Sequence, residues 1–236
     1  MKAERLLQSQ GFGTRRECRT LIRSHLLTVD GQLIDDPLAE LNIPSGLHFE
    51  VAGESWQYHE KAYIALYKPS GYECSRKPQH HPSIFDLLPI QLRRRDIQCV
   101  GRLDQDTTGL LLLSDDGQFI HYWSSGKKQI PKVYEITTRH IVDDSIVAKL
   151  LNGVQLHDEP APIHAMACEI THDFGLRLTI GEGRYHQVKR MIAAAGNRVE
   201  ALMRCRIGGL KLSETLQSGQ WRWLERKDIN VLSDFK

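Results

Sequence analysis

Asp104 is the residue whose surroundings most clearly indicate chemistry. It lies in a polar segment, residues 101–109, that leads directly into the apolar run 110–113. A short apolar run bounded by turn residues predicts a buried strand, and a buried strand is a rigid support for a reactive group. Arg102 is two residues away and would favour the ionised form of the Asp104 carboxyl. An ionised carboxylate serves as a nucleophile or a base rather than as a general acid.

A structural ion pair between Arg102 and Asp104 explains the same two residues equally well on physical grounds, so this alternative stays open. Three further carboxylates follow in the next dozen residues, and they are weaker candidates. Asp106 belongs to the same polar segment. Asp115 and Asp116 most simply form a turn and cap the helix that follows.

Two later segments carry other reactive side chains. Tyr134 lies in an alternating stretch, residues 132–138, that predicts a strand. Lys189 lies on a predicted helix with an apolar face, around residues 184–195. The simpler interpretations are a half-buried strand tyrosine and a surface lysine. His186 is interpreted as a capping or packing residue at the start of the helix.

The elements that must position these residues indicate an α+β domain with a mixed, mainly antiparallel sheet. Strands are expected around residues 63–67, 97–101, 109–114, 132–138, 165–170 and 176–181, and helices around 117–124, 143–152 and 184–195. The polar stretch 53–60 is typical of a linker. It predicts a small domain over 1–54 and a catalytic domain over 61–236.

The first 54 residues predict two short helices and a hairpin. A helix near residues 3–9 is followed by a capping box from Thr14, which starts a second helix to about residue 26, and a hairpin at 28–34. Arg15, Arg19 and Arg23 recur every four residues and form one stripe on the second helix. A charge stripe is usually a solvated face. The small number of acids nearby favours contact with RNA phosphates instead.

Charge is unevenly distributed along this chain of 236 residues, whose net charge is only +2. Residues 1–27 and 177–211 are basic, and the second of these segments contains Arg184, which we expect to contact a polyanion. The five cysteines occur singly, which fits neither a disulfide framework nor a zinc site. No apolar run is long enough to cross a membrane, and the N-terminus lacks the pattern of a signal peptide, so the cytoplasm is the expected location.

The segment GRLDQDTTGLLLL, residues 101–113, resembles the defining motif of the pseudouridine synthases of the RsuA/RluA type. Residues 132–134 resemble the K-x-Y motif of that family, and residues 181–191 resemble its third motif. The resemblance implies that Asp104 is the essential aspartate, that Tyr134 is the family tyrosine, and that Lys189 pairs with the aspartate. It also implies that Arg102 occupies the gap left by a flipped nucleotide.

The N-terminal pattern of two short helices and a "TVDG" hairpin resembles the S4-type RNA-binding domain. Together with Lys189, it favours the RsuA-like branch. Residues 114–118 and 153–157 most resemble the members of this branch that act on the 16S RNA of the small ribosomal subunit. The resemblance implies a monomer without cofactor or metal, acting on ribosomal RNA or a pre-ribosomal small-subunit particle. The alternatives are a 23S rRNA enzyme of the RluB-like type and a non-catalytic rRNA-binding assembly factor.

Overall fold

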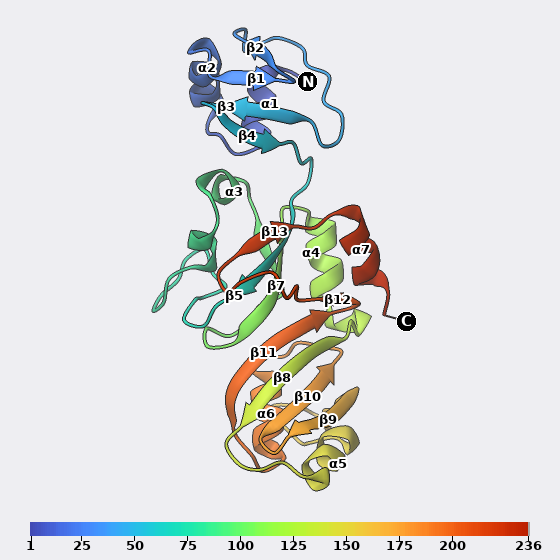
Figure 1. Ribbon diagram of the computed structural model, residues 1–236. Coiled ribbons are helices and arrows are strands. Elements are labelled where there is room, and N and C mark those ends of the chain that lie inside the picture. The colour runs from blue at the N-terminus through green and yellow to red at the C-terminus, as the bar shows by residue number, and fades with distance from the viewer. Residues whose placement is uncertain (236) are drawn as a thin grey trace. The chain divides into compact units, whose positions relative to one another are not determined.

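The computed structural model describes residues 1–235, which form two compact units (Figure 1). The first unit combines Met1–Ala62 with Leu88–Gln98, and the second combines Tyr63–Leu87 with the chain from Cys99 onward. The first unit therefore extends past residue 54 and includes a segment from the middle of the chain. Arg95 joins that segment to the rest of the unit: its Nη1 donates to Gln10 Oε1 at 3.1 Å and to the His59 carbonyl at 2.9 Å.

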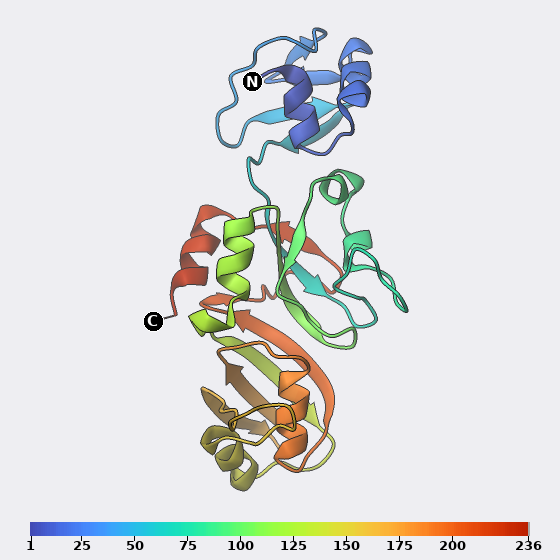
Figure 2. The ribbon, with the colours of Figure 1, turned by 180° about the vertical axis from the view of Figure 1, so that it is seen from behind.

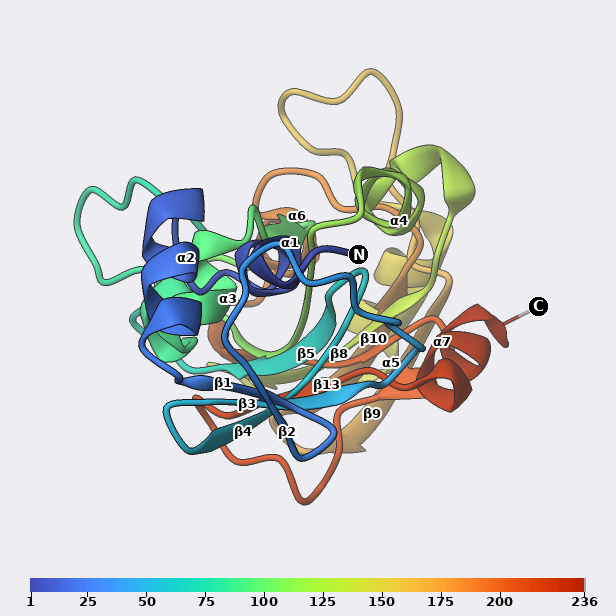
Figure 3. The ribbon, with the colours of Figure 1, turned by 90° about the horizontal axis from the view of Figure 1, so that it is seen from above.

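The first unit packs two helices on one side of a four-stranded antiparallel sheet with the order β2-β1-β3-β4 (Figure 3). Its elements are α1 (Ala3–Ser9), α2 (Arg15–Arg23), β1 (Leu27–Val29), β2 (Gln32–Ile34), β3 (His48–Val51), β4 (Glu54–Gln57) and the short helix α3 (Ile90–Arg94). Buried residues from both layers form its core, among them Leu6, Ile22 and Phe49.

Local sequence signals account for the first half of this unit. The predicted capping box is present, because the Thr14 hydroxyl accepts from the Glu17 amide and the Glu17 carboxylate accepts from the Thr14 amide. The predicted hairpin is also present, with Asp30 and Gly31 both at positive φ, as a tight two-residue turn requires. The predicted linker was wrong, since residues 54–57 form β4. The backbone of these residues forms hydrogen bonds with β3, and such pairing cannot be predicted from the polar composition of the segment.

In the described residues, nine strands form the sheet of the second unit, with β13-β5-β7-β11-β8-β10-β9 as its main path, β12 beside β11 and β6 beside β7. The strands are β5 (Tyr63–Lys68), β6 (Gln98–Val100), β7 (Thr108–Ser114), β8 (Lys132–Thr138), β9 (Ala167–His172), β10 (Gly175–Ile180), β11 (Val199–Ile207), β12 (Leu210–Lys211) and β13 (Trp221–Trp223). The pairing of β11 with β7 is parallel, whereas β5, β8, β10 and β13 pair antiparallel with their neighbours. The prediction of an α+β domain with a mixed, mainly antiparallel sheet is confirmed.

The helices described in the second unit are α4 (Gly117–Ser124), α5 (Asp144–Asn152), α6 (Gln187–Ala194) and α7 (Arg226–Ser233). Short 3-10 turns occur at Ile84–Leu87 and Gly126–Lys128. Helices α4 and α7 lie side by side against the sheet (Figure 2), where Trp123 and Leu232 join a core with Leu110 and Leu112 of β7. Asp116 caps α4 as predicted, accepting from the amides of Gln118 and Phe119.

The central strand β11 was not predicted. Register shifts interrupt its pairing with β8 at two places, and three of its nine residues are arginine or glutamate. A bulged strand with charged residues lacks the regular alternation by which a strand is predicted. None of the described helices combines the length and the apolar character needed to cross a membrane.

Candidate active site

Asp104 lies in the turn between β6 and β7. The Thr107 amide donates to the Asp104 carbonyl at 3.1 Å, which closes the turn immediately before the buried strand. The Asp104 side chain is 26% exposed and lines two pockets of the second unit, one of about 100 Å³ and a larger one of about 810 Å³. The predicted buried strand is confirmed, because Gly109–Ser114 are all buried. The catalytic candidate therefore stands at the end of a rigid support.

Lys68 holds this turn in place through hydrogen bonds to backbone carbonyl groups. Its side chain is completely buried, and its ammonium group donates to three carbonyl oxygens: Pro69 at 3.0 Å, Gln105 at 2.9 Å and Thr107 at 2.8 Å. Burial lowers the pKa of Lys68, while Asp106 and Asp104 nearby oppose that change. Sequence reasoning missed this residue, since a lysine at the end of a strand is usually solvated. Its effect is to hold the backbone on both sides of Asp106 in one conformation.

Two nitrogen atoms of the segment that starts α6 face the Asp104 carboxylate. His186 Nε2 lies 3.3 Å from Asp104 Oδ1, and Lys189 Nζ lies 3.4 Å from Asp104 Oδ2. The contact predicted between Lys189 and Asp104 is therefore present. Lys189 also donates to Asp106 Oδ1 at 2.6 Å, and although partial burial opposes it, this contact lowers the pKa of Asp106.

His186 packs against Tyr185, but its side chain does not cap the helix. It occupies the N-cap position of α6 without making a side-chain cap, in the left-handed region at φ 47° and ψ 31°. This conformation is costly for a residue other than glycine, and such strain is concentrated at functional sites. The His186 ring is stacked on Tyr185, with 3.9 Å between ring centres, and it contacts Asp104 on one edge. No sequence pattern announces a positive φ at a histidine.

The alternative of a structural ion pair between Arg102 and Asp104 was wrong. Among the described residues, no ion pair joins these two side chains, and Arg102 is exposed while lining both pockets around Asp104. Lys189, 85 positions further along the chain, supplies the cation instead.

Tyr134 lines the smaller pocket together with Asp104, and its side chain is only 6% exposed. Lys132 precedes it by two residues on β8, and both residues are buried on the same side of the strand. Arg204 of β11 is the register partner of Tyr134 and lines the same pocket. An aromatic ring and two cations thus surround the space next to the carboxylate.

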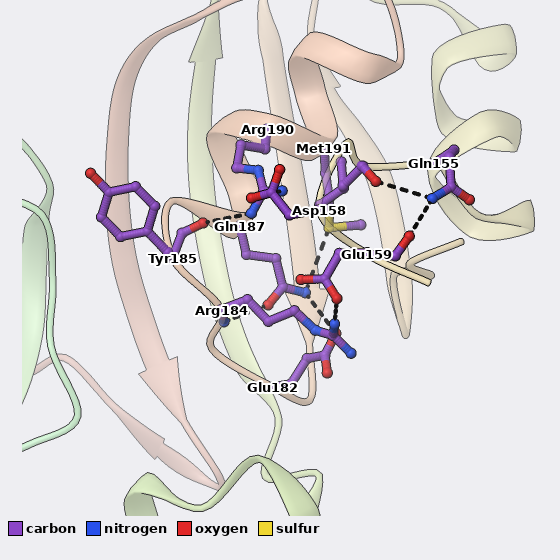
Figure 4. A network of polar contacts seen from close by, with 10 residues as sticks. Gln155, Asp158, Glu159, Glu182, Arg184, Tyr185, Gln187, Arg190 and Met191 are labelled. Atoms are coloured by element: carbon purple, nitrogen blue, oxygen red, sulfur yellow. Dashed lines mark hydrogen bonds and ion pairs between the residues drawn. The ribbon is translucent and has the colours of Figure 1, made fainter. Parts of the chain in front are cut away.

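Arg184 is held by acidic neighbours (Figure 4). Its guanidinium group forms ion pairs with Glu159 and, at 3.0 Å, with Glu182. Arg190 of α6 pairs with Asp158 at 3.1 Å in the same network. These ion pairs connect Asp158 and Glu159, in the loop after α5, to the start of α6. Arg184 lines both pockets near Asp104, but part of its charge is neutralised.

The arginine stripe of α2 also has an internal partner. The completely buried Glu4 carboxylate accepts from Arg15 Nε at 2.9 Å and Nη2 at 2.7 Å, and it pairs with Arg19 Nε. The two hydrogen-bonded guanidinium groups lower the pKa of Glu4 to about 2. Arg23 is exposed. Sequence reasoning treated the stripe as one surface, whereas two of its members stabilise a buried charge.

Comparison with known proteins agrees with this geometry. Residues 62–194 match the profile of a family described as RNA pseudouridylate synthase. The ribosomal small subunit pseudouridine synthase A of Haemophilus influenzae is 34% identical over 98% of this chain and 99% of its own length. The protein of that name from Escherichia coli is 36% identical over 97% and 98%. A crystal structure of a pseudouridylate synthase has 33% identity and a TM-score of 0.69, covering 98% of this chain and 99% of its own. The chain belongs to the RNA pseudouridylate synthase family.

Proposed function

We propose that this enzyme converts one uridine of 16S ribosomal RNA to pseudouridine, with Asp104 as the catalytic carboxylate. The observation that carries the proposal is the contact of both Asp104 oxygens with nitrogen atoms, His186 Nε2 and Lys189 Nζ, beside the pocket that Tyr134 lines. The match over nearly the full length to proteins named for the small ribosomal subunit favours 16S over 23S rRNA.

The reaction breaks the C1′–N1 glycosidic bond, turns the base, and joins its C5 atom to C1′. Neither oxidation nor transfer to a second molecule occurs, so the reaction itself calls for no cofactor. Asp104 acts on the sugar, either by attack on C1′ or by removal of the C2′ proton. Both routes require an ionised carboxylate, and Lys189 Nζ lies 3.4 Å from one of its oxygens.

The target base must leave its stack before the carboxylate can reach the sugar, which costs a few kcal/mol. Tyr134 offers a ring against which the flipped base stacks in the pocket. Arg102, exposed at the rim, fills the space that the nucleotide vacates. Lys189 holds Asp104 in place and offsets the charge of Asp106.

The first unit serves as an S4-like RNA-binding domain in this proposal. Arg23 is exposed, and the side chains of Arg15 and Arg19 remain 61% and 38% exposed while they pair with Glu4, so all three can face phosphates. Arg184 contributes to the RNA surface of the second unit. The enzyme acts as a monomer in the cytoplasm, on free 16S rRNA or on a pre-ribosomal small-subunit particle.

The test is the Asp104→Asn variant, which keeps the shape of the side chain and removes its charge. Purified protein is incubated with unmodified 16S and 23S rRNA transcripts, and pseudouridines are mapped by chemical labelling and primer extension. We expect one new pseudouridine in 16S rRNA with the wild type, none with Asp104→Asn, and RNA affinity within a few-fold. Asp173→Asn, at an exposed position outside both pockets, is the matched control and retains activity.

Each alternative has its own outcome in this experiment. Product in 23S rRNA alone would move the substrate to the large subunit. RNA binding without any product from the wild type would identify a non-catalytic binding protein. Substantial turnover by Asp104→Asn would remove the carboxylate from the mechanism.

A further inference from the structure

Two buried side chains beside Asp104 each have a polar atom without a hydrogen-bond partner in the part of the chain that the structure describes. They are Arg204, whose Nη2 is unpaired, and Thr107, whose Oγ1 is unpaired. Arg204 is 2% exposed and Thr107 is 1% exposed, and both line the smaller pocket. A buried donor without a partner is costly, and a buried charge is more so. Such groups indicate a ligand that supplies the missing partner.

The position of Arg204 is built into the sheet. Its backbone pairs in parallel with Gly109 of β7. A Cβ atom on Gly109, whose φ is +103°, would lie 2.3 Å from the Arg204 carbonyl oxygen, so only glycine allows this approach. One side of the guanidinium is anchored, because Nε donates to the Leu110 carbonyl at 2.8 Å. The sheet therefore fixes Arg204 while leaving Nη2 unpaired.

A second buried cation lies near Arg204. Lys132 is 7% exposed, and its ammonium group donates to the carbonyl oxygens of Ile130 at 3.1 Å and Gly181 at 3.5 Å. Burial, together with the charge of Arg204, lowers the pKa of Lys132 to about 8. Within the described residues, no carboxylate forms an ion pair with Lys132 or Arg204. Both cations of this pocket thus lack an ion-paired carboxylate, and Glu182 opposes the lowering of the Lys132 pKa only in part.

We propose that Arg204, supported by Lys132, binds a carbonyl oxygen of the target uracil and stabilises the negative charge that the base acquires when its C1′–N1 bond breaks. Arg204 lies directly across from Tyr134 in the register of β11 and β8, so a base stacked on that ring is adjacent to the guanidinium. The Asp104 carboxylate has His186 and Lys189 as its own partners, which leaves the charge of Arg204 for the base.

The inference rests on the proposed function, and the electrons balance in both routes open to Asp104. The C1′–N1 electron pair leaves with the base, so the detached uracil carries one negative charge spread over N1 and its two carbonyl oxygens. C5 then bonds to C1′, which breaks the C1′–O bond to Asp104 in the first route and returns the proton from Asp104 to C2′ in the second. The C5 proton is then lost, and N1 takes up a proton. A preorganised cation at a carbonyl oxygen lowers the free energy of the transition state in which this charge develops.

The experiment compares two leaving groups. One 16S rRNA transcript contains uridine, and a second contains 5-fluorouridine throughout. Fluorine withdraws electrons from the ring, so 5-fluorouracil carries the negative charge more easily and depends less on Arg204. The readout is the single-turnover rate constant for disappearance of the target nucleotide. We expect Arg204→Met to slow uridine conversion roughly 100-fold and 5-fluorouridine conversion no more than about tenfold.

Equal losses on the two substrates would overturn the inference, since a structural role of Arg204 cannot distinguish one base from the other. Arg206→Met is the matched control, because Arg206 lies on the same strand but lines a different pocket, and its two rate constants should change by the same factor. If Arg204→Met fails to fold, the same two rate constants are measured for Lys132→Met. An equal loss of rate on both substrates in that variant would also overturn the inference. A wild type without activity on 16S rRNA would refute the proposed function itself.

Discussion

Replacing Lys132 by methionine should change the way in which the free energy of unfolding depends on pH. The Lys132 ammonium group is buried, and it has carbonyl oxygens rather than a carboxylate as partners. Its pKa is about 8 in the folded chain, against an ordinary value of 10.5. The folded state therefore disfavours the protonated form, and this penalty depends on the proton that methionine cannot bind.

The sign and size of the effect follow from proton linkage. Below pH 8 the group is protonated in both states, and the folded protein bears the full penalty. Between pH 8 and 10.5 the unfolded chain binds more protons than the folded chain, so stability rises with pH. The separation of the two pKa values corresponds to roughly 3 kcal/mol, at about 1.4 kcal/mol for each pH unit. Between pH 7 and about pH 11, the free energy of unfolding of the wild type should therefore rise by this amount relative to that of Lys132→Met.

The measurement is urea unfolding followed by tryptophan fluorescence at pH 7, 8, 9 and 10. Titrations of other groups occur in both proteins and cancel in the difference between them. Lys127→Met removes an exposed lysine and serves as the control, with a pH-independent difference from the wild type. A Lys132→Met difference that stays constant from pH 7 to 10 would show that Lys132 titrates normally. The unpaired positive charge inferred for the pocket would then be wrong.

Three further predictions concern the first unit. Changing Arg15 and Arg19 together to glutamine should lower the melting temperature of this unit, because the buried carboxylate that they share loses its charge partners. Arg23→Gln should leave the melting temperature unchanged and reduce the slope of log K against log salt for RNA binding by about 0.7–0.9. An unchanged slope would make Arg23 a solvated residue. Deleting residues 1–54 should expose the segment 88–98 to limited proteolysis while the second unit stays folded, and resistance of that segment would show that it packs independently.

Local pattern was sufficient for the features that depend on neighbours in sequence. The apolar run after Asp104 predicted the buried strand, the Thr14 capping box predicted α2, and the Asp-Gly pair predicted the hairpin turn. These elements form because backbone hydrogen bonding and side-chain periodicity act over a few residues. The contact of Lys189 with Asp104 was expected from the family resemblance, and the structure contains it.

Apart from Lys189, tertiary structure alone decided which groups surround the carboxylate. Lys68, His186 and Arg204 come from three distant parts of the chain, and their roles depend on burial, a left-handed backbone conformation and an approach between two strands. The same residue types on an exposed surface would be solvated. Glu4 shows this in the first unit, since an acidic residue near the N-terminus becomes a buried anchor for two arginines only once α1 packs against α2.

The physical reason is that electrostatic interactions depend on distance in space and on exclusion of water, and sequence spacing reports neither. Arg102 is two residues from Asp104 and forms no ion pair with it among the described residues, whereas Lys189 lies 3.4 Å from it across the pocket. The sequence determined which carboxylate stands at the end of a buried strand. Folding determined which cations hold that carboxylate, and which buried cation remains unpaired beside it.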